Sequence, residues 1–505
     1  MRETELPVEG GATSHRARLK RSGMFRAVRG VLRFAAYSNV GCAPVWPADL
    51  DYTPDRAEVL QCTSHYTARF QAPSHGGDLP TRLCGSTLKR IMFRAIVATV
   101  LSFLSFRFAI AQTAPFYLRD GDTVVFYGDS ITEQRYYASL VETYVVTRFP
   151  DLKVRFVASG WGGDRVSGGG GGLIDVRLTR DVETYKPTVV TILLGMNDGH
   201  YQSFSDKAFN EYAAGYQHII RKLKAFDPPP RLVLLRPSPY DEISRPPLVP
   251  EGYNNSVLVR YGDFLTELGK KENVEVVDLN TPVVDVLTKA NLNDPALAMK
   301  IIPDRIHPSP AASLIMAETL LKAWNASPLV SQVIIDGPRR VSTKNTAVSG
   351  LDVSAGLSWS QTDRCLPMPV DLNDPVTRLV LNSSDFQDAL DLETLQVADL
   401  PAGRYVLKID NFPAGAFSAD QLASGINIST QVTAMEKQAA DVFRLVTRHN
   451  EIHFFLWRSV QVGLARDPLN ISSAATALND LEDQVINLEK AAARPKPHTF
   501  SLSEQ

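Results

Sequence analysis

Short apolar runs alternate with amphipathic helical patterns between residues 120 and 325. The predicted strands are mainly apolar and do not alternate with polar residues, which is typical of a parallel sheet whose two faces are both covered by helices. The expected strands are Thr123–Tyr127, Val154–Ala158, Thr188–Leu194, Leu232–Leu235 and Val274–Asp278. The expected helices span 135–149, about 173–184, 206–226, the segment that ends near 271, and 309–324. The pattern predicts an α/β fold, a three-layer α/β/α sandwich with a five-stranded parallel sheet.

The pattern changes after Ala326, where alternating residues and turn residues become frequent. This change predicts a β-rich module over residues 329–428, with Arg404–Asp410 as its clearest strand. Two apolar stripes at three- and four-residue spacing then predict a helical hairpin over residues 429–494. We expect both stripes to be buried. They are Val432, Met435, Ala439, Val442, Val446 and Leu478, Leu481, Val485, Leu488. The Pro-rich segment 495–505 is expected to be a loose tail.

An uninterrupted apolar stretch, Ala95–Phe106, follows several basic residues and precedes the small-residue sequence Ala109–Ala111. These are the three parts of an export signal. Twelve helical residues rise only about 18 Å, too short to span a bilayer core. We therefore expect residues 92–111 to be a signal peptide cleaved after Ala111, and the protein to be periplasmic or secreted. The alternatives are an uncleaved anchor or a buried core helix.

Residues 1–91 precede this signal, are rich in arginine and show no sustained helical or strand periodicity. We interpret them as a non-native extension upstream of a true start at Met92, or as a disordered extension. The mature chain would begin with a catalytic domain over residues 112–328. Beyond residue 111 the only cysteine is Cys365, so no disulfide is expected within the mature chain.

The composition, 44% hydrophobic and 21% charged, is that of an ordinary globular protein. It excludes a wholly disordered, collagen-like or disulfide-scaffold protein. The net charge of −2 conceals an asymmetry, because residues 1–91 carry five excess basic side chains and residues 112–505 carry nine excess acidic ones. An acidic body lacks the electrostatic footprint of a nucleic-acid-binding protein. We also expect no stable membrane insertion once the signal is removed.

Four short fragments rich in catalytic residue types lie at the ends of predicted elements of the sheet. The first is Gly128-Asp129-Ser130, directly after the first strand. Ligands of open parallel sheets bind beyond the carboxyl ends of the strands. Each fragment alone could be a helix cap, a turn or a satisfied histidine, but together they supply a nucleophile, a base and anion donors. The other three are Ser159-Gly-Trp-Gly-Gly-Asp-Arg165, Gly195-Met-Asn-Asp198 and Asp304-Arg-Ile-His307.

In order and spacing these fragments resemble the four sequence blocks of the SGNH/GDSL hydrolase superfamily, in the form found in bacterial exported members. The residues that give the superfamily its name are matched by Ser130, Gly163, Asn197 and His307. The one departure in the first block is Ile131, where leucine is usual. The resemblance covers about residues 120–325. It implies a flavodoxin-like SGNH hydrolase fold and a serine esterase that needs no metal or cofactor.

Ester hydrolysis assigns a role to each matched residue. Ser130 is expected to be the nucleophile and His307 the base that accepts its proton. Asp304 lies three residues before His307 and can orient the imidazole from within the same loop. The resemblance implies an oxyanion hole formed by the backbone N–H groups of Ser130 and Gly163 and by the side-chain amide of Asn197. Asp129 and Asp198 are expected to support these loops.

The expected substrate is a small-molecule or polysaccharide ester, with acetyl groups on a carbohydrate as the first hypothesis. A lipid or lysophospholipid esterase is the alternative. The region 329–494 could instead dock a polysaccharide or protein.

Two other features favour structural interpretations. The run Gly168–Gly172 lacks the context of a dinucleotide-binding loop and is expected to form a loop wall beside the site. His449 and His453 have the spacing of a metal-binding pair, but no further ligand cluster accompanies them in the sequence.

Overall fold

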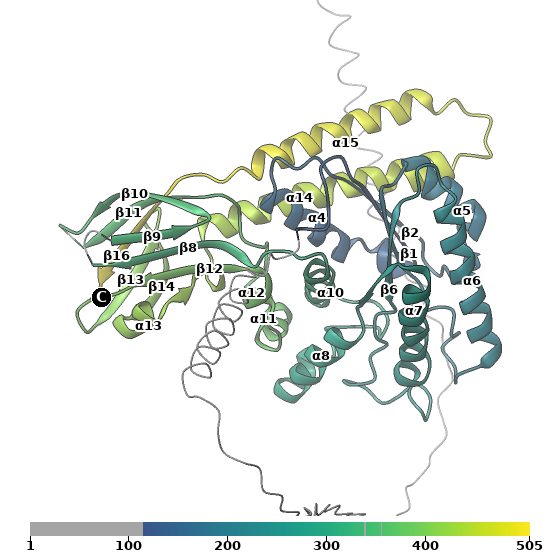
Figure 1. Cartoon of the computed structure of the whole chain (residues 1–505), viewed down its shortest axis with the longest axis horizontal. Helices are drawn as coiled ribbons and strands as arrows, with labels where there is room; N and C mark the ends of the chain where they lie inside the picture. Colours follow the sequence, from purple (N-terminus) through teal and green to yellow (C-terminus); the bar gives the residue numbers. More distant parts are fainter. Residues whose placement is uncertain (1–114, 338–339, 355) are drawn as a thin grey trace, which may run out of the picture. The chain divides into compact units, whose positions relative to one another are not determined.

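Residues 115–337, 340–354 and 356–505 are described by a computed structural model. Residues 113–505 form one compact unit (Figure 1). The predicted extension over residues 1–91 and the predicted signal peptide over residues 92–111 lie outside the described residues.

A five-stranded sheet, parallel throughout, forms the centre of the first part of the chain. The strand order is β2-β1-β5-β6-β7, so the chain adds β2 on one side of β1 and then β5, β6 and β7 on its other side. The carboxyl ends of β1 and β5 therefore meet at the switch point where ligands bind in such sheets. The predicted α/β fold is confirmed. The strands are β1 Thr123–Gly128, β2 Arg155–Gly160, β5 Val189–Leu193, β6 Arg231–Arg236 and β7 Glu275–Asp278.

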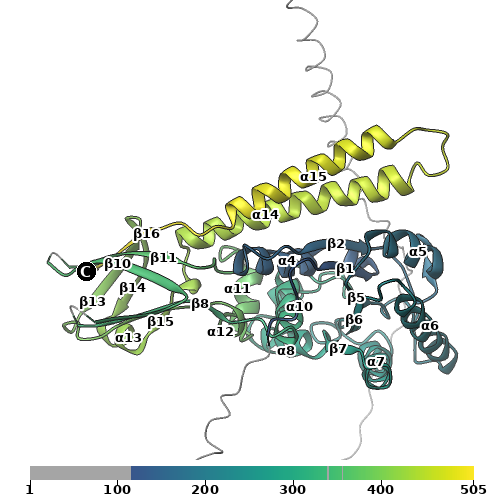
Figure 2. The same ribbon diagram turned by 45° about the horizontal axis from the view of Figure 1, so that its top comes forward.

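Helices cover both faces of this sheet, as the continuous burial of its central strands requires (Figure 2). One group is α4 Tyr136–Arg148, α8 Thr281–Asn293 and α10 Pro310–Ala323, which pack together. The other is α5 Ile174–Asp181, α6 Asp206–Lys224 and α7 Val259–Glu272. Helix α8 is not among the helices predicted from the sequence. The shorter elements are α3 Ser130–Glu133, η2 Glu183–Tyr185, η3 Asn254–Leu258 and α9 Pro295–Ala298.

Two further sheets enclose a second hydrophobic core between residues 329 and 504. The first has the order β10-β11-β16-β13-β14 and the second the order β15-β12-β8-β9. Inward residues alternate along β8, β11 and β12, as expected for strands buried on one face. The strands are β8 Leu329–Asp336, β9 Arg340–Lys344, β10 Thr346–Asp352, β11 Leu357–Asp363, β12 Leu392–Val397, β13 Arg404–Ile409, β14 Phe412–Ser418, β15 Ile426–Asn427 and β16 His498–Glu504. Two short helical segments, α13 Ala419–Ser424 and η4 Ile428–Thr430, complete this part.

The prediction that residues 495–505 form a loose tail is wrong. Strand β16 lies in the middle of its sheet, paired with β11 on one side and β13 on the other. Phe500 and Leu502 are buried in the second core, whereas the alternate residues Thr499, Ser501 and Ser503 are more exposed. The alternation is present in the sequence, but the partner strands lie far away in the chain. The proline residues that precede β16 therefore suggested a loop.

Part of the predicted β-rich module belongs to the body built around the parallel sheet. Helices α11 Pro375–Asn382 and α12 Phe386–Leu390 interrupt the strands and pack on α10. Their apolar residues, including Val380 and Phe386, join the core of the first sheet. The body built around the parallel sheet thus extends beyond the predicted boundary at residue 328.

The C-terminal helices lie side by side in both views (Figures 1 and 2). They are α14 Ala434–Phe454, which continues as the π-helix η5 Phe455–Val462, and α15 Ser472–Ala492. Most of the first predicted stripe is buried in the second core: Met435, Ala439, Val442 and Val446. Val432 is an exception, because it precedes α14 and is 45% exposed.

The second predicted stripe is correct only in part, because Val485 is buried and Leu478 is half-buried but the other two leucines are not. Leu481 and Leu488 are exposed, and Glu482 and Glu489 are buried in their place. These two glutamates face histidines of α14, since Glu489 lies 2.6 Å from His449 Nδ1 and Glu482 lies 3.4 Å from His453 Nδ1. These histidine–glutamate contacts across the seam turn a polar face of α15 inward, which apolar periodicity cannot indicate.

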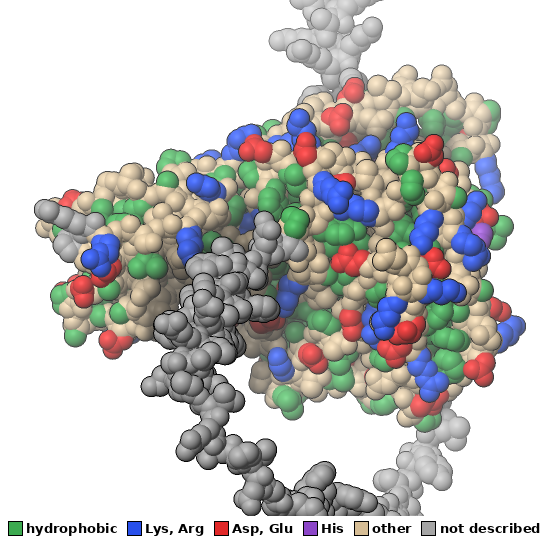
Figure 3. All heavy atoms as spheres, in the orientation of Figure 1, with side chains coloured by type: hydrophobic (Ala, Val, Ile, Leu, Met, Phe, Trp, Pro, Cys, Tyr) green, Lys and Arg blue, Asp and Glu red, His purple; other side chains and the backbone are tan. Residues whose placement is uncertain are grey.

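None of the helices within the described ranges is long and apolar enough to cross a membrane. On the face shown in Figure 3, basic and acidic side chains are interspersed and do not separate into fields of one sign.

Candidate active site

The fragment Gly128-Asp129-Ser130 lies at the carboxyl end of β1, where Ser130 begins the short helix α3. The side chain of Asp129 caps this helix, accepting the N–H of Ile131 at 3.0 Å. Strands β1 and β2 end side by side at Gly128 and Gly160. A Cβ atom at Gly160 would lie 2.1 Å from the backbone nitrogen of the last residue of α3. Glycine is thus required for the helix to start so close to the sheet.

The structure brings Ser130, His307 and Asp304 into one hydrogen-bonded series. Ser130 Oγ lies 2.8 Å from His307 Nε2, although the two residues are 177 positions apart. On the other side of the ring, His307 Nδ1 lies 2.6 Å from Asp304 Oδ2. A proton on Nδ1 that is donated to Asp304 leaves Nε2 free to accept the proton of the serine hydroxyl.

Asp304 is held as an anion by its own loop. Its Oδ1 accepts the backbone N–H groups of Ile306 at 3.0 Å and His307 at 2.8 Å. Burial opposes ionisation of Asp304, but the hydrogen bonds from the His307 ring and from these N–H groups outweigh it and lower the pKa to about 2. The same hydrogen bond to Asp304 raises the pKa of His307 above its ordinary value. His307 is therefore a stronger base than a free histidine.

Gly163, the predicted oxyanion donor, lies in an exposed turn that follows β2. The N–H of Asp164 bonds to the carbonyl of Trp161 at 3.1 Å, and the φ angle of Gly163 is +76°. A turn of four residues with positive φ at its third residue is a type II turn, which favours glycine at that place. The second block of the resemblance thus forms a defined turn at the end of β2.

Asn197 follows β5 and is fixed by three hydrogen bonds. Its Oδ1 accepts the hydroxyl of Tyr201 at 2.8 Å. Its Nδ2 donates to the carbonyl of Asp164 at 3.0 Å and to Asp129 Oδ2 at 3.3 Å. The hydroxyl of Tyr201 thereby sets the amide so that Nδ2 faces the end of β1. This hydrogen bond is the contact that Tyr201 makes beside the site.

The two predicted supporting carboxylates, Asp129 and Asp198, are both buried. Asp198 Oδ1 accepts the backbone N–H of Val166 at 3.0 Å, which joins the end of β5 to the loop after β2. Burial raises the pKa of each carboxyl to about 7. Both residues bind backbone groups of the loops that carry Ser130 and Gly163, as expected of supporting residues.

Several residues that hold the site were not identified in the sequence. Arg177 on α5 is completely buried, bonds to Asp164 at 2.7 Å and also pairs with Asp181. Glu133 accepts the N–H of Gly162 at 2.6 Å. In the sequence, an arginine or glutamate on an amphipathic helix is read as solvent-facing, and neither residue belongs to one of the four fragments.

Trp161 and the glycine run beside the site have structural roles. Trp161 is half-buried, with the guanidinium of Arg458 lying 3.3 Å above its ring, so that face cannot stack on a sugar. His200 is exposed. The run Gly168–Gly172 forms two short paired strands, β3 Gly168–Gly169 and β4 Gly172–Leu173. A Cβ at Gly171 would lie 2.6 Å from the ring of Trp161, so the run packs closely against it.

Glu142, His449 and Glu489 form a buried group whose ligand-type atoms lie within 4.8 Å of one another. The two carboxylates are on different ring nitrogens, since His449 Nδ1 is 2.6 Å from Glu489 and Nε2 is 3.4 Å from Glu142. Burial opposes the charge on His449, but the two glutamates outweigh it and raise the pKa to about 9. The histidine thus lies as an imidazolium between the carboxyl groups of two glutamates. A metal ion could bind here only by displacing one of these contacts.

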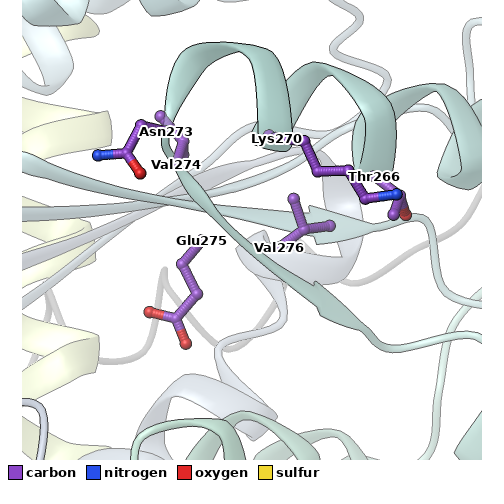
Figure 4. Close-up of a pocket in the computed structure, with 7 residues that line it drawn as sticks. Thr266, Lys270, Asn273, Val274, Glu275 and Val276 are labelled. Carbon is purple, nitrogen blue, oxygen red and sulfur yellow. The ribbon is translucent and has the colours of Figure 1, made fainter.

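A hollow lined by Thr266, Lys270 and Glu275 lies between the end of α7 and the start of β7 (Figure 4). It is at the amino end of the parallel strands, whereas Ser130 is beyond their carboxyl ends. This hollow therefore has no part in the site.

Comparisons with known proteins agree with this geometry. The GDSL-like Lipase/Acylhydrolase family matches residues 126–313. BT4096, a gut microbial diltiazem-metabolizing enzyme, has a solved structure that is 24% identical, with a TM-score of 0.67. The match covers 78% of this chain and 100% of BT4096, so the likeness of fold extends beyond the hydrolase domain. The search of the curated proteins found no match.

Two further solved structures match a smaller share of the chain. The acetyl xylan esterase AlAXEase is 20% identical, with a TM-score of 0.32, and the match covers 40% of this chain and 98% of that one. The psychrotrophic esterase EstA from Pseudoalteromonas sp. is 17% identical, with a TM-score of 0.29, and the match covers 40% and 96%. Residues 126–313 are thus a GDSL-like lipase/acylhydrolase domain of the SGNH/GDSL superfamily, and the protein is a carboxylic ester hydrolase.

Proposed function

We propose that this hydrolase uses Ser130 as nucleophile, His307 as general base and Asp304 as the group that orients the imidazole. The observation that carries the proposal is the series Asp304–His307–Ser130, joined at 2.6 and 2.8 Å. Both distances are within the range that direct proton transfer requires.

The reaction follows from this arrangement. Ser130 Oγ attacks the acyl carbon while its proton passes to His307 Nε2. The negative charge that forms on the carbonyl oxygen is stabilised by the N–H groups of Ser130 and Gly163 and by the amide of Asn197. The imidazolium then protonates the departing alcohol. Water repeats the sequence on the acyl-enzyme, releases the acid and restores the serine hydroxyl.

We further propose that the substrate is an ester with a short acyl group, with acetylated carbohydrate as the first candidate. Ser130 is half-buried, whereas Gly163 and Asp304 are exposed, which leaves room for a bulky alcohol part. A specific observation favours a lipid or lysophospholipid as the second candidate. Arg305, in the loop of His307, donates a hydrogen bond to the carbonyl of Pro246. The loop that contains Pro246 also exposes two apolar side chains, Ile243 and Leu248.

A substrate panel separates these two candidates. We expect faster turnover of aryl acetate than of butyrate or octanoate, and release of acetate from acetylated xylan or pectin. When the acyl group is small, the open site has room for a polymer as the alcohol part of the ester. Preference for octanoate, with no acetate released from polymer, would replace the carbohydrate proposal with the lipid one.

The pH profile tests the role of His307. The base acts only when it is neutral, so kcat/KM is expected to fall as pH drops below the pKa of His307. Because Asp304 raises that pKa, the inflection should lie above the ordinary value of about 6.5. Asp304→Asn removes the charged partner and should move the inflection to lower pH while reducing kcat. An inflection that the substitution leaves in place would contradict this assignment.

A further inference from the structure

The predicted oxyanion donor Gly163 owes its orientation to a single peptide unit. In the turn Trp161–Asp164 the Gly162–Gly163 peptide is the central one, and types I and II differ by reversal of that peptide. The φ of +76° at Gly163 identifies type II. Reversal would direct the N–H of Gly163 to the opposite side of the turn. Whatever holds the two ends of this turn therefore determines whether the donor is available.

Glu133 holds one end of the turn. It is the last residue of α3, the helix that Ser130 begins, and its Oε2 accepts the N–H of Gly162 at 2.6 Å. A hydrogen bond to a carboxylate is stronger than one between neutral groups. The other oxygen, Oε1, lies 3.1 Å from Nη2 of Arg458.

Arg458 reaches this site from the C-terminal helices, through the π-helical segment η5. Its guanidinium lies 3.3 Å from the ring centroid of Trp161, and its Nη1 donates to the carbonyl of Gly160 at 3.4 Å. The side chain is only 19% exposed. A planar guanidinium can stack and form an ion pair at the same time, as no other side chain can. Arg458 thus contacts Glu133 and both residues that lead into the turn.

The neighbouring residue, Trp457, acts on the other end of the turn. Its Nε1 donates to Asp181 at 2.7 Å. Asp181 pairs with Arg177, which bonds to Asp164 at 2.7 Å. Two adjacent side chains of η5 are therefore connected to the two ends of the turn. π-Helical turns in proteins are frequent at functional sites.

We propose that Arg458 is a positioning residue for ester hydrolysis, which through Glu133 and Trp161 holds the Gly162–Gly163 peptide with its N–H toward the oxyanion. The inference rests on the proposed function, because it assigns a purpose to the oxyanion hole. It makes the C-terminal helices a working part of the active site and not only a support for the β-sheets.

The test is the kinetics of Arg458→Ala and Glu133→Ala, alone and together, with aryl acetate as substrate. We expect Arg458→Ala to lower kcat about tenfold, because a displaced donor stabilises the transition state less. KM should stay within about twofold, since ground-state binding does not use the oxyanion. The loss of kcat in the double variant should be smaller than the product of the two single losses, because Arg458 acts in part through Glu133. Arg458→Lys should recover part of the loss.

Arg448→Ala is the matched control, because Arg448 lies on the same helix and forms an ion pair with exposed Glu451. It should change neither kcat nor the pH profile. The inflection in kcat/KM should also stay in place in Arg458→Ala, because the pair of His307 and Asp304 is untouched. If Arg458→Ala fails to fold, Glu133→Gln carries the test, since it keeps an acceptor for Gly162 but removes the charge.

Unchanged kcat in a folded Arg458→Ala or Glu133→Gln, or effects that simply add in the double variant, would overturn the inference. Retained turnover in Ser130→Ala would instead overturn the proposed function, so the two failures are distinguishable.

Discussion

Ser130→Ala is expected to reduce ester hydrolysis by about 10⁴-fold or more while leaving the fold intact. In the proposed mechanism the hydroxyl forms the acyl-enzyme, and neither His307 nor Asp304 can replace it. Its hydrogen bond in the structure is to the half-buried ring of His307, which can bond to water once the hydroxyl is gone. The free energy of unfolding should therefore change by no more than about 0.5 kcal/mol. Hydrolysis of aryl acetate and thermal melting measure the two effects on the same sample.

Ser205→Ala is the control for this variant. Ser205 also stands at the start of a helix, where it caps α6 by accepting the N–H of Ala208. Its loss should cost about 1 kcal/mol of stability and no activity, the opposite pattern. A serine-directed phosphonate should label Ser130 alone in the wild-type protein. Label on a different serine, or near-normal turnover by Ser130→Ala, would remove the proposed mechanism.

Val442→Asp is expected to give the largest loss of stability, about 3–5 kcal/mol. Val442 is completely buried on α14, in the core shared with the two C-terminal sheets. A carboxylate there would be buried without a partner or would have to be protonated. Chemical denaturation measures the change in the free energy of unfolding.

Val432→Asp is the matched control, because the sequence places Val432 in the same apolar stripe and the structure leaves it 45% exposed. It should melt like the wild type. If Val442→Asp also melted normally but no longer bound polymer, the stripe would be a docking face, and its structural role would be wrong. Since α14 continues into η5, partial unfolding of this helix should also lower activity.

The parallel sheet and the meeting of the four fragments at its edge could be predicted from the sequence alone, whereas helix α8 and the packing of α11 and α12 on α10 could not. Strands β1, β2 and β5 are short, mainly apolar segments that can be recognised without information from distant parts of the chain. Each is followed directly by one of the fragments carrying Ser130, Gly163 or Asn197. The carboxyl ends of parallel strands meet at one edge, so the order along the chain already implied a common site. The spacing of Asp304 and His307 placed base and acid in one loop.

The arrangement of the C-terminal region depends on contacts between segments that are remote in sequence. The alternation of Phe500 and Leu502 acquires meaning when β11 and β13 approach from either side. Glu482 and Glu489 face inward because histidines on α14 meet them, an inversion that no apolar pattern signals. Arg458 lies more than 290 residues from Trp161, and its role depends on where a distant helix comes to rest. Apolar periodicity indicates which face of a helix or strand is buried. The partner of a buried charge, by contrast, is set by packing between segments that are remote in sequence.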